Sequence, residues 1–265
     1  MSAFHREHAY VAQPMDLANI PTHKLAENQK PTKENQDLYA AATTGDLEGV
    51  TSALSAGGNP NWFKNPEAGA SALHKAASGG HVACIELLLK NGSVVDERLL
   101  TNQSSPLHLA CANGHLEAVK VLVAASAAIN AGNSYGNAPI YGALIGGHRA
   151  VVETLLDNGS DAKWTNNKHS SLLHFLAYSP MNDTDKEAVM RKLVDSGVDV
   201  NLQDEDGMSP LHIVARGGDK AMAKLLLDNG ADDTLRDATG KTALQLAQLN
   251  SRTEVGLLLN ARVAK

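Results

Sequence analysis

The sequence predicts an all-α protein, built as a solenoid of antiparallel helix pairs with hairpin loops between the pairs. The main observation is a four-residue pattern of Ser or Thr, a small residue or Pro, Leu and His. With some variation it starts at residues 71, 105, 138, 171, 209 and 242, at intervals of 34, 33, 33, 38 and 33 residues. Two apolar runs at helical spacing follow each start. Because such short helices are unstable alone in water, neighbouring pairs must stack and bury their apolar faces.

The stretch from residue 105 to residue 123 shows how one unit is expected to fold. Ser105 can accept a hydrogen bond from a free backbone N–H and so begin a helix. Pro106 suits the first turn, where no amide donor is needed, and Leu107 faces the core. Gly114 favours the left-handed conformation that ends a helix. The apolar run 116–123 then predicts a second helix.

The period near 33 residues, together with this four-residue pattern, resembles the ankyrin-repeat family. The resemblance covers residues 36–265 in seven helix pairs, of which the first and the last act as caps. It implies an ankyrin-repeat solenoid with short β-hairpin fingers that project to one side. It also implies that the chain binds other proteins through the fingers and the concave face of the first helices.

Two units depart from the pattern. Ala138 and Tyr141 stand where Ser and His are usual, and Gly142 is expected to weaken that helix. The fifth unit carries five extra residues in the segment 179–187, where we expect a capping box from Thr184 to Glu187. Both features predict a softer centre of the array.

Residues 1–35 carry no convincing period and include three prolines. We expect a flexible or loosely docked leader, with no secretory signal. A short linear motif around Met15 to Ile20 is the less favoured interpretation.

Composition limits the kinds of partner. The formal net charge is 23 − 29 = −6, which disfavours nucleic acid and anionic membranes as partners. No apolar run reaches the 18 residues of a membrane span, and Cys84 and Cys111 are expected to be small buried residues. We expect a monomer in the cytoplasm or the nucleus.

Four histidines recur with the pattern, His74, His108, His174 and His212. Each is one repeat from the next, and no Cys or carboxylate recurs beside them at ligand spacing. We therefore expect each ring to hold the start of its own helix. No catalytic, cofactor or metal site is predicted.

The candidate partner-binding residues are those that the family pattern places on the fingers and late in the first helices. We expect Tyr178 and Arg216 to be contact residues, with Tyr135 on a finger. For Trp62 and Trp164, packing against a neighbouring finger is an equally favoured alternative. The full set is Tyr135, Tyr178, Arg216, Glu205, Asp206, Asn113, Ile145, Trp62, Phe63 and Trp164.

Three functions stay open at this point. The first is a non-enzymatic adaptor or scaffold, and the second is a regulatory or inhibitory subunit of a partner enzyme. The third is an enzyme with an unrecognised convergent site. Acidic finger residues Glu205 and Asp206 favour a partner segment that carries an apolar residue near Lys or Arg.

Overall fold

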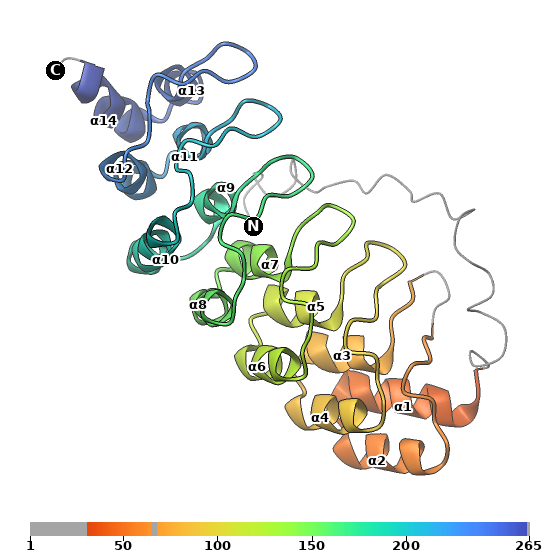
Figure 1. The fold of residues 1–265 in the computed structure, drawn as a ribbon. Coiled ribbons are helices and arrows are strands. Elements are labelled where there is room, and N and C mark those ends of the chain that lie inside the picture. Colours follow the sequence, from red (N-terminus) through yellow and green to blue (C-terminus); the bar gives the residue numbers. More distant parts are fainter. Residues whose placement is uncertain (1–30, 65–67, 264–265) are drawn as a thin grey trace.

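The computed structural model describes residues 31–64 and 68–263, and these form a single stack of helix pairs (Figure 1). Described residues contain fourteen α-helices. The leader motif predicted around Met15 lies outside the described residues. The first four pairs are α1 (Lys33–Thr44) and α2 (Leu47–Ser55), α3 (Ala72–Gly79) and α4 (Val82–Lys90), α5 (Pro106–Ala112) and α6 (Leu116–Ala124), and α7 (Pro139–Gly146) and α8 (Arg149–Asp157). The last three are α9 (Leu172–Tyr178) and α10 (Asp183–Asp195), α11 (Pro210–Gly217) and α12 (Lys220–Asp228), and α13 (Ala243–Leu249) and α14 (Thr253–Val263).

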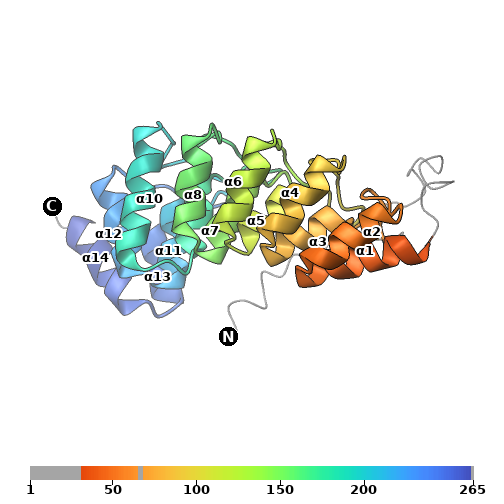
Figure 2. The same ribbon diagram turned by 90° about the horizontal axis from the view of Figure 1, so that it is seen from below.

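The helices form two layers. Odd-numbered helices lie side by side in one layer and even-numbered helices in the other, while the loops between pairs project beyond the odd-numbered layer (Figures 1 and 2). The predicted solenoid is therefore confirmed. One apolar core runs through the stack, with Leu107 and Leu211 fully buried between repeats, as their place in the pattern predicts.

The pattern histidines hold the helix starts. In α3, α5, α9 and α11 the Ser hydroxyl lies 2.9, 2.9, 2.8 and 2.8 Å from Nδ1 of the histidine three residues later. The Ser backbone N–H also donates to Nδ1, so the proton sits on Nε2. Nε2 then donates to a carbonyl of the next finger, for example from His174 to Met208 at 2.9 Å. Each ring thus starts its own helix and also fastens the following repeat.

In the fourth repeat, Tyr141 takes the place of the histidine and fastens the following repeat. Its hydroxyl lies 2.8 Å from the carbonyl of Trp164 and 3.0 Å from that of Ser170. The ring packs edge-on against Phe175, with centroids 4.5 Å apart. Replacement of His by Tyr therefore keeps the hydrogen bond to the next finger. Only the bond at the helix start is lost, since Ala138 has no hydroxyl.

A second set of histidines joins repeats at the turn inside each pair. The ring nitrogen Nε2 of each lies close to a carbonyl at the end of the odd-numbered helix in the repeat before. The distances are 3.2 Å for His81, 2.9 Å for His115 and 3.2 Å for His148. Each ring sits on a glycine of the preceding repeat, and a Cβ on Gly45 or Gly80 would approach it within 3.0 Å. These glycines are needed for close contact as well as for their positive φ.

The fingers are loops rather than the β-hairpins that we expected. Among the described residues there are two isolated β-bridges, Phe63 with Ser71 and Thr165 with Ser171, and no named strand. Single backbone bonds link each finger to the next, as from Ser134 N–H to the carbonyl of Asn102 at 2.9 Å. The ladder is too short to form a sheet because each finger offers its neighbour one such bond.

The insertion in the fifth repeat lengthens α10 by four residues relative to α8. The helix begins two residues earlier than predicted, because Asn182 and not Thr184 caps it, by accepting a bond from Asp185 N–H at 2.9 Å. Pro180 lies over Gly147, where a histidine lies in the preceding repeats. The capping box from Thr184 was therefore wrong, although the helix that it introduced is present.

Candidate partner-binding surface

One register position of the odd-numbered helices defines the candidate surface. It is occupied along the stack by Ser78, Ala112, Ile145, Tyr178, Arg216 and Leu249. Small residues occupy it in α3 and α5, and large ones from α7 onward. Ile145 is 46% exposed and Leu249 is 66% exposed. We call the four large residues, Ile145, Tyr178, Arg216 and Leu249, the first-helix patch.

A separate apolar cluster lies beside this patch. Met208, Ile213 and Leu246 are buried together, and the ring of Tyr178 packs against them. This cluster is distinct from the main core of the stack. The patch is therefore backed by packed side chains, which favours a surface of fixed shape.

Tyr178 and Arg216 are brought together as predicted for neighbouring repeats. The Arg216 guanidinium donates to the Tyr178 hydroxyl at 2.8 Å. Arg252, which occupies the place of the turn histidines in the last repeat, donates from Nε to the carbonyl of Arg216 at 2.9 Å. The patch thus combines apolar surface with a fixed positive charge.

The acidic finger residues are less available than we expected. Glu205 forms an ion pair with Lys168 of the preceding finger, with 2.5 Å between Nζ and Oε1. Asp206 is exposed at the fingertip, and its carbonyl accepts the N–H of Ala238. The pair of negative charges inferred from the sequence is therefore reduced to one carboxylate and one neutralised pair.

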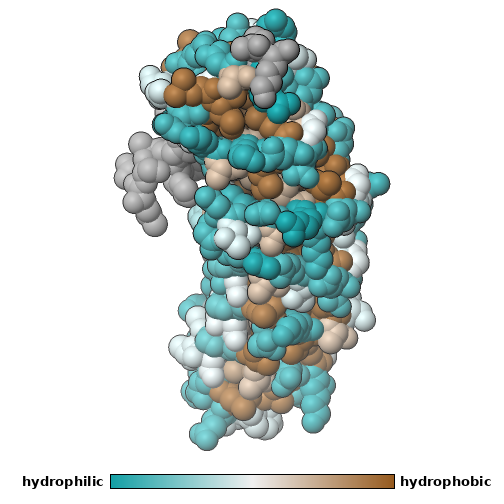
Figure 3. Space-filling view, turned by 90° about the vertical axis from the view of Figure 1, so that its left-hand side faces the viewer, coloured by the Kyte–Doolittle hydropathy of each residue, from teal (hydrophilic) through white to brown (hydrophobic). Residues whose placement is uncertain are grey.

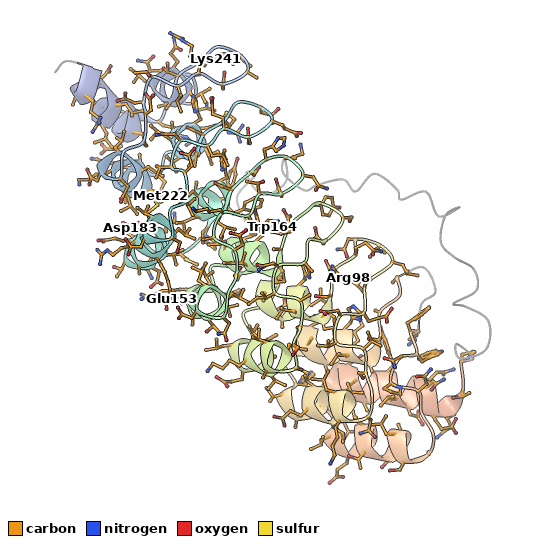
Figure 4. All side chains as sticks on the ribbon, viewed as in Figure 1. Arg98, Glu153, Trp164, Asp183, Met222 and Lys241 are labelled. Atoms are coloured by element: carbon orange, nitrogen blue, oxygen red, sulfur yellow. The ribbon has the colours of Figure 1, made fainter. Side chains whose placement is uncertain are left out.

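The tryptophans pack within the protein. Trp62 is 3% exposed and stands edge-on to Tyr39, with centroids 6.1 Å apart. Trp164, labelled in Figure 4, donates from its indole to the carbonyl of Gly136 of the neighbouring finger at 2.8 Å. Of the two interpretations left open, packing within the protein therefore accounts for both rings. Trp62 has almost no exposed surface that a partner could contact. Phe63 is partly exposed and takes part in the bridge to Ser71.

Two further candidates have mixed surroundings. Tyr135 is partly exposed on a finger, and its backbone carbonyl accepts the N–H of Asn167 at 3.0 Å. Asn113 is exposed at the end of α5, and its amide donates to the carbonyl of Leu109 at 3.0 Å and to the hydroxyl of Ser78 at 3.3 Å. Asn113 is next to the register position of the patch in α5, whereas Tyr135 lies on a finger that projects beyond the odd-numbered layer.

The opposite, even-numbered layer carries ion pairs that the sequence did not reveal. Arg149 of α8 binds Asp185 of α10 at 2.9 Å, and Lys186 of α10 binds Asp219, the cap of α12, at 2.5 Å. A cleft of about 250 Å³ lies between α10 and α12, where Asp183 and Met222 are labelled in Figure 4. On this side, Figure 3 shows apolar areas divided by polar ones, the broadest near the C-terminal repeats. The five extra residues of the fifth repeat, which lengthen α10, are the feature of the sequence that could have pointed to these contacts.

Residues 31–64 and 68–263 contain no group of three His, Cys, Asp or Glu side chains placed to hold a metal ion. Within the same ranges, no helix has the length and apolar character needed to cross a membrane.

The stacked helix pairs, the histidine-fastened helix starts and the projecting fingers define a repeat protein of the ankyrin class. The sequence matches the family of ankyrin repeats over residues 38–133, 94–167 and 173–264, and the chain belongs to that family. Ankyrin repeats are generally protein–protein interaction modules.

The chain is similar to the crystal structure of the human ASB11 ankyrin repeat domain. The TM-score is 0.73 at 30% identity, and the match covers 85% of this chain and 96% of that one. It is 27% identical over 201 residues to a Caenorhabditis elegans homologue of transient receptor potential cation channel subfamily A member 1, covering 74% of this chain and 16% of that protein. It is 33% identical over 91 residues to ankyrin repeat and SOCS box protein 11 of Danio rerio, covering 34% of this chain and 30% of that protein. The chain therefore spans less than a third of the length of these two curated relatives.

Proposed function

We propose that this chain is a non-enzymatic adaptor or scaffold that binds a partner protein through the first-helix patch and the adjacent fingers. The observation that carries this proposal is the position of the patch. Ile145 and Leu249 are large apolar side chains left exposed at one register position, on the face that the fingers flank. Tyr178 lies between these two along the row, and apolar side chains gathered on one exposed face are typical of interaction surfaces.

The other candidate residues differ in how well a partner could contact them. We propose Tyr178 and Arg216 as the central contacts, with Tyr135, Asn113 and Asp206 at the rim, because aromatic and Arg side chains are frequent anchors. Glu205 would contribute as an ion pair with Lys168. Phe63 and Trp164 would contribute only their exposed edges.

The test is capture of a partner by the immobilised full-length chain, followed by comparison of point variants. Ile145→Asp and Leu249→Asp should each weaken capture at least tenfold. Leu257→Asp is the matched control, since Leu257 is 61% exposed on α14, in the other layer. Equal capture by all three variants, each with an unchanged melting temperature, would place the binding surface elsewhere.

The role of the interaction is a second question. A regulatory or inhibitory subunit would change the activity of a captured enzyme, whereas a scaffold would leave that activity unchanged. The assay is the activity of the captured partner with and without the chain. We further propose that the chain is a monomer in the cytoplasm or the nucleus, and its mass in solution by light scattering should then be near 27.9 kDa.

A further inference from the structure

We infer that the cleft between α10 and α12 holds an apolar side chain of a partner protein, while a basic side chain of the same segment binds at its edge. This inference goes beyond the proposed function, because the cleft lies in the even-numbered layer and not at the first-helix patch (Figures 1 and 4). The reasons are the size of the cleft, the residues at its floor and the charge that its ion pairs leave over.

The cleft has the size of one large side chain. Its volume is about 250 Å³, below the range of about 300–1,000 Å³ that is typical of sites for small molecules. A cavity of about 150 Å³ is enough to hold benzene. The cleft therefore suits one side chain such as Leu rather than a whole ligand.

The floor of the cleft is apolar because of two residues of α12. Met222 is almost fully buried and Leu225 is half-buried, and both line the cleft. At the same register positions, α8 has the shorter Val151 and the polar Thr154. Methionine is flexible and adapts to side chains of different shape. An apolar side chain of a partner would therefore displace water from a surface that can pack around it.

The charges around the cleft leave it negative. The charged residues that line it are Asp183, Lys186, Glu187, Lys224 and Asp228, so two ammonium groups and three carboxylates give a net charge of 2 − 3 = −1. Lys186 binds Asp219, which does not line the cleft, at 2.5 Å. The other lysine, Lys224, binds Asp228. Glu187 binds Arg191 of its own helix at 2.9 Å.

Asp183 stays outside these pairs. It is the exposed first residue of α10, and within the described residues 31–64 and 68–263 no ion pair includes it. Bonds between a carboxylate and Arg are charge-assisted and stronger than neutral ones. Charges at the rim of an interface contribute to specificity more than to affinity. The cleft thus favours a segment in which a basic residue accompanies the apolar one.

The positions of these groups set the spacing within the partner segment. Asp183 lies three residues before Lys186, and Met222 lies three residues after Asp219, to which Lys186 binds. Since every helix pair repeats the same arrangement, neighbouring even-numbered helices run in the same direction (Figure 2). A rise of about 1.5 Å per residue then places Asp183 and Met222 about 9 Å apart along the helix axes. In an extended segment, side chains two positions apart lie on the same side at about 6.6 Å, and a long Arg side chain covers the remainder.

The experiment is a titration of the isotope-labelled full-length chain with two synthetic peptides that have blocked ends, followed by NMR. The first peptide is Gly-Ser-Arg-Ser-Leu-Ser-Gly, and the second has Glu in place of Arg. We expect the first to shift the amides of residues 183–187 and 221–228 and to bind at least threefold more tightly than the second. Equal affinity for both peptides, shifts confined to other helices, or no binding of the first peptide would each overturn the inference.

Ala221→Leu tests the apolar half of the site. Ala221 is exposed and lines the cleft, so a larger side chain there should fill the cleft and weaken binding of the first peptide at least threefold. Ala150→Leu is the matched control, because Ala150 is exposed at the same register position of α8. Its affinity should equal that of the unchanged chain.

Asp183→Lys tests the charge at the edge of the cleft and should reverse the preference between the two peptides. Glu48→Lys is its matched control, because Glu48 is an exposed carboxylate in the first turn of α2. A preference unaltered in Asp183→Lys, or full binding by Ala221→Leu, would refute the inference. Both positions are exposed, so neither change disturbs the core. Either failure leaves the proposed function intact, since neither residue belongs to the first-helix patch.

Discussion

The buried imidazoles of His74 and His108 make the fold sensitive to acid. Burial lowers the pKa of each to about 4 from an ordinary value of 6.5. Between these values the unfolded chain binds protons that the folded chain does not, so stability falls as the pH falls from about 6.5 towards 4. Burial also lowers the pKa of His174 and His212, which adds to the same trend.

We therefore expect a steep loss of stability on acidification. Each of His74 and His108 should remove about 2 kcal/mol of unfolding free energy between pH 7.5 and pH 5, since a tenfold change in a protonation equilibrium corresponds to about 1.4 kcal/mol. Urea unfolding at a series of pH values measures this. The double variant His74→Asn/His108→Asn should be less stable at pH 7.5 but should lose less on acidification. A slope equal to that of the unchanged chain would show that these rings do not control it.

The Tyr141 hydroxyl gives a second prediction at the residue scale. Tyr141→Phe removes the donor to the carbonyls of Trp164 and Ser170 in a buried place. The loss should cost about 1–3 kcal/mol, because a carbonyl left without its donor keeps its desolvation penalty. Urea unfolding of the variant tests this, with Tyr39→Phe in α1 as the control, because the contacts of Tyr39 are made by its ring. A loss of equal size in the control would show that the cost does not come from the two buried hydrogen bonds of Tyr141.

At the scale of the helix, Gly142 has a packing role that propensity alone conceals. The sequence suggested only that this glycine weakens α7. A Cβ at Gly142 would lie 3.1 Å from the Ala112 Cβ and 3.2 Å from its Cα, so α5 and α7 approach closely there. Because the contact includes backbone, it cannot be relieved by a rotamer change.

Gly142→Ala should therefore destabilise the protein by about 1–3 kcal/mol, as overpacking does, although Ala is the better helix former. Gly256→Ala is the opposite case. A Cβ at Gly256, inside α14, would meet nothing within 4 Å, so stability should rise by up to about 1 kcal/mol. Thermal melting of both variants decides the matter, and a stabilising Gly142→Ala would refute the close contact.

At the scale of the whole molecule, the stack transmits stability from neighbour to neighbour. Repeats joined only through adjacent interfaces open locally where an interface is weak. The segment 179–186 replaces the histidine turn of the second to fourth repeats, although Met181 and Ser179 within it are buried. The helix α7 is better held than its glycines suggested, because Tyr141 binds the next finger.

We accordingly expect hydrogen exchange to be faster in residues 179–186 than in residues 209–228, with α7 close to the latter. Exchange followed by mass spectrometry of peptides gives this order directly. Uniform protection of 179–186 and 209–228 would mean that the insertion is as firmly packed as a regular repeat.

The sequence by itself determined the solenoid, the helix starts and the core. These depend on contacts within one repeat, such as Ser105 with His108, and on periodic burial of residues such as Leu107, and both can be read from local pattern. The expected role of the histidines in holding the helix starts is confirmed for the same reason, as in the bond between His108 and Ser105. The position of Tyr178 next to Arg216 also followed from the period alone.

Only the tertiary structure decided which side chains a partner can reach. Trp62 is buried, Trp164 is bonded to another finger, and Glu205 is paired with Lys168. The contacts of Trp164 and Glu205 join neighbouring repeats, and no single copy of the pattern specifies them. In the same way, the cleft between α10 and α12 arises where two repeats of unequal length meet. A repeat sequence fixes each unit, whereas the charge and exposure of the binding face depend on what the adjacent unit places beside it.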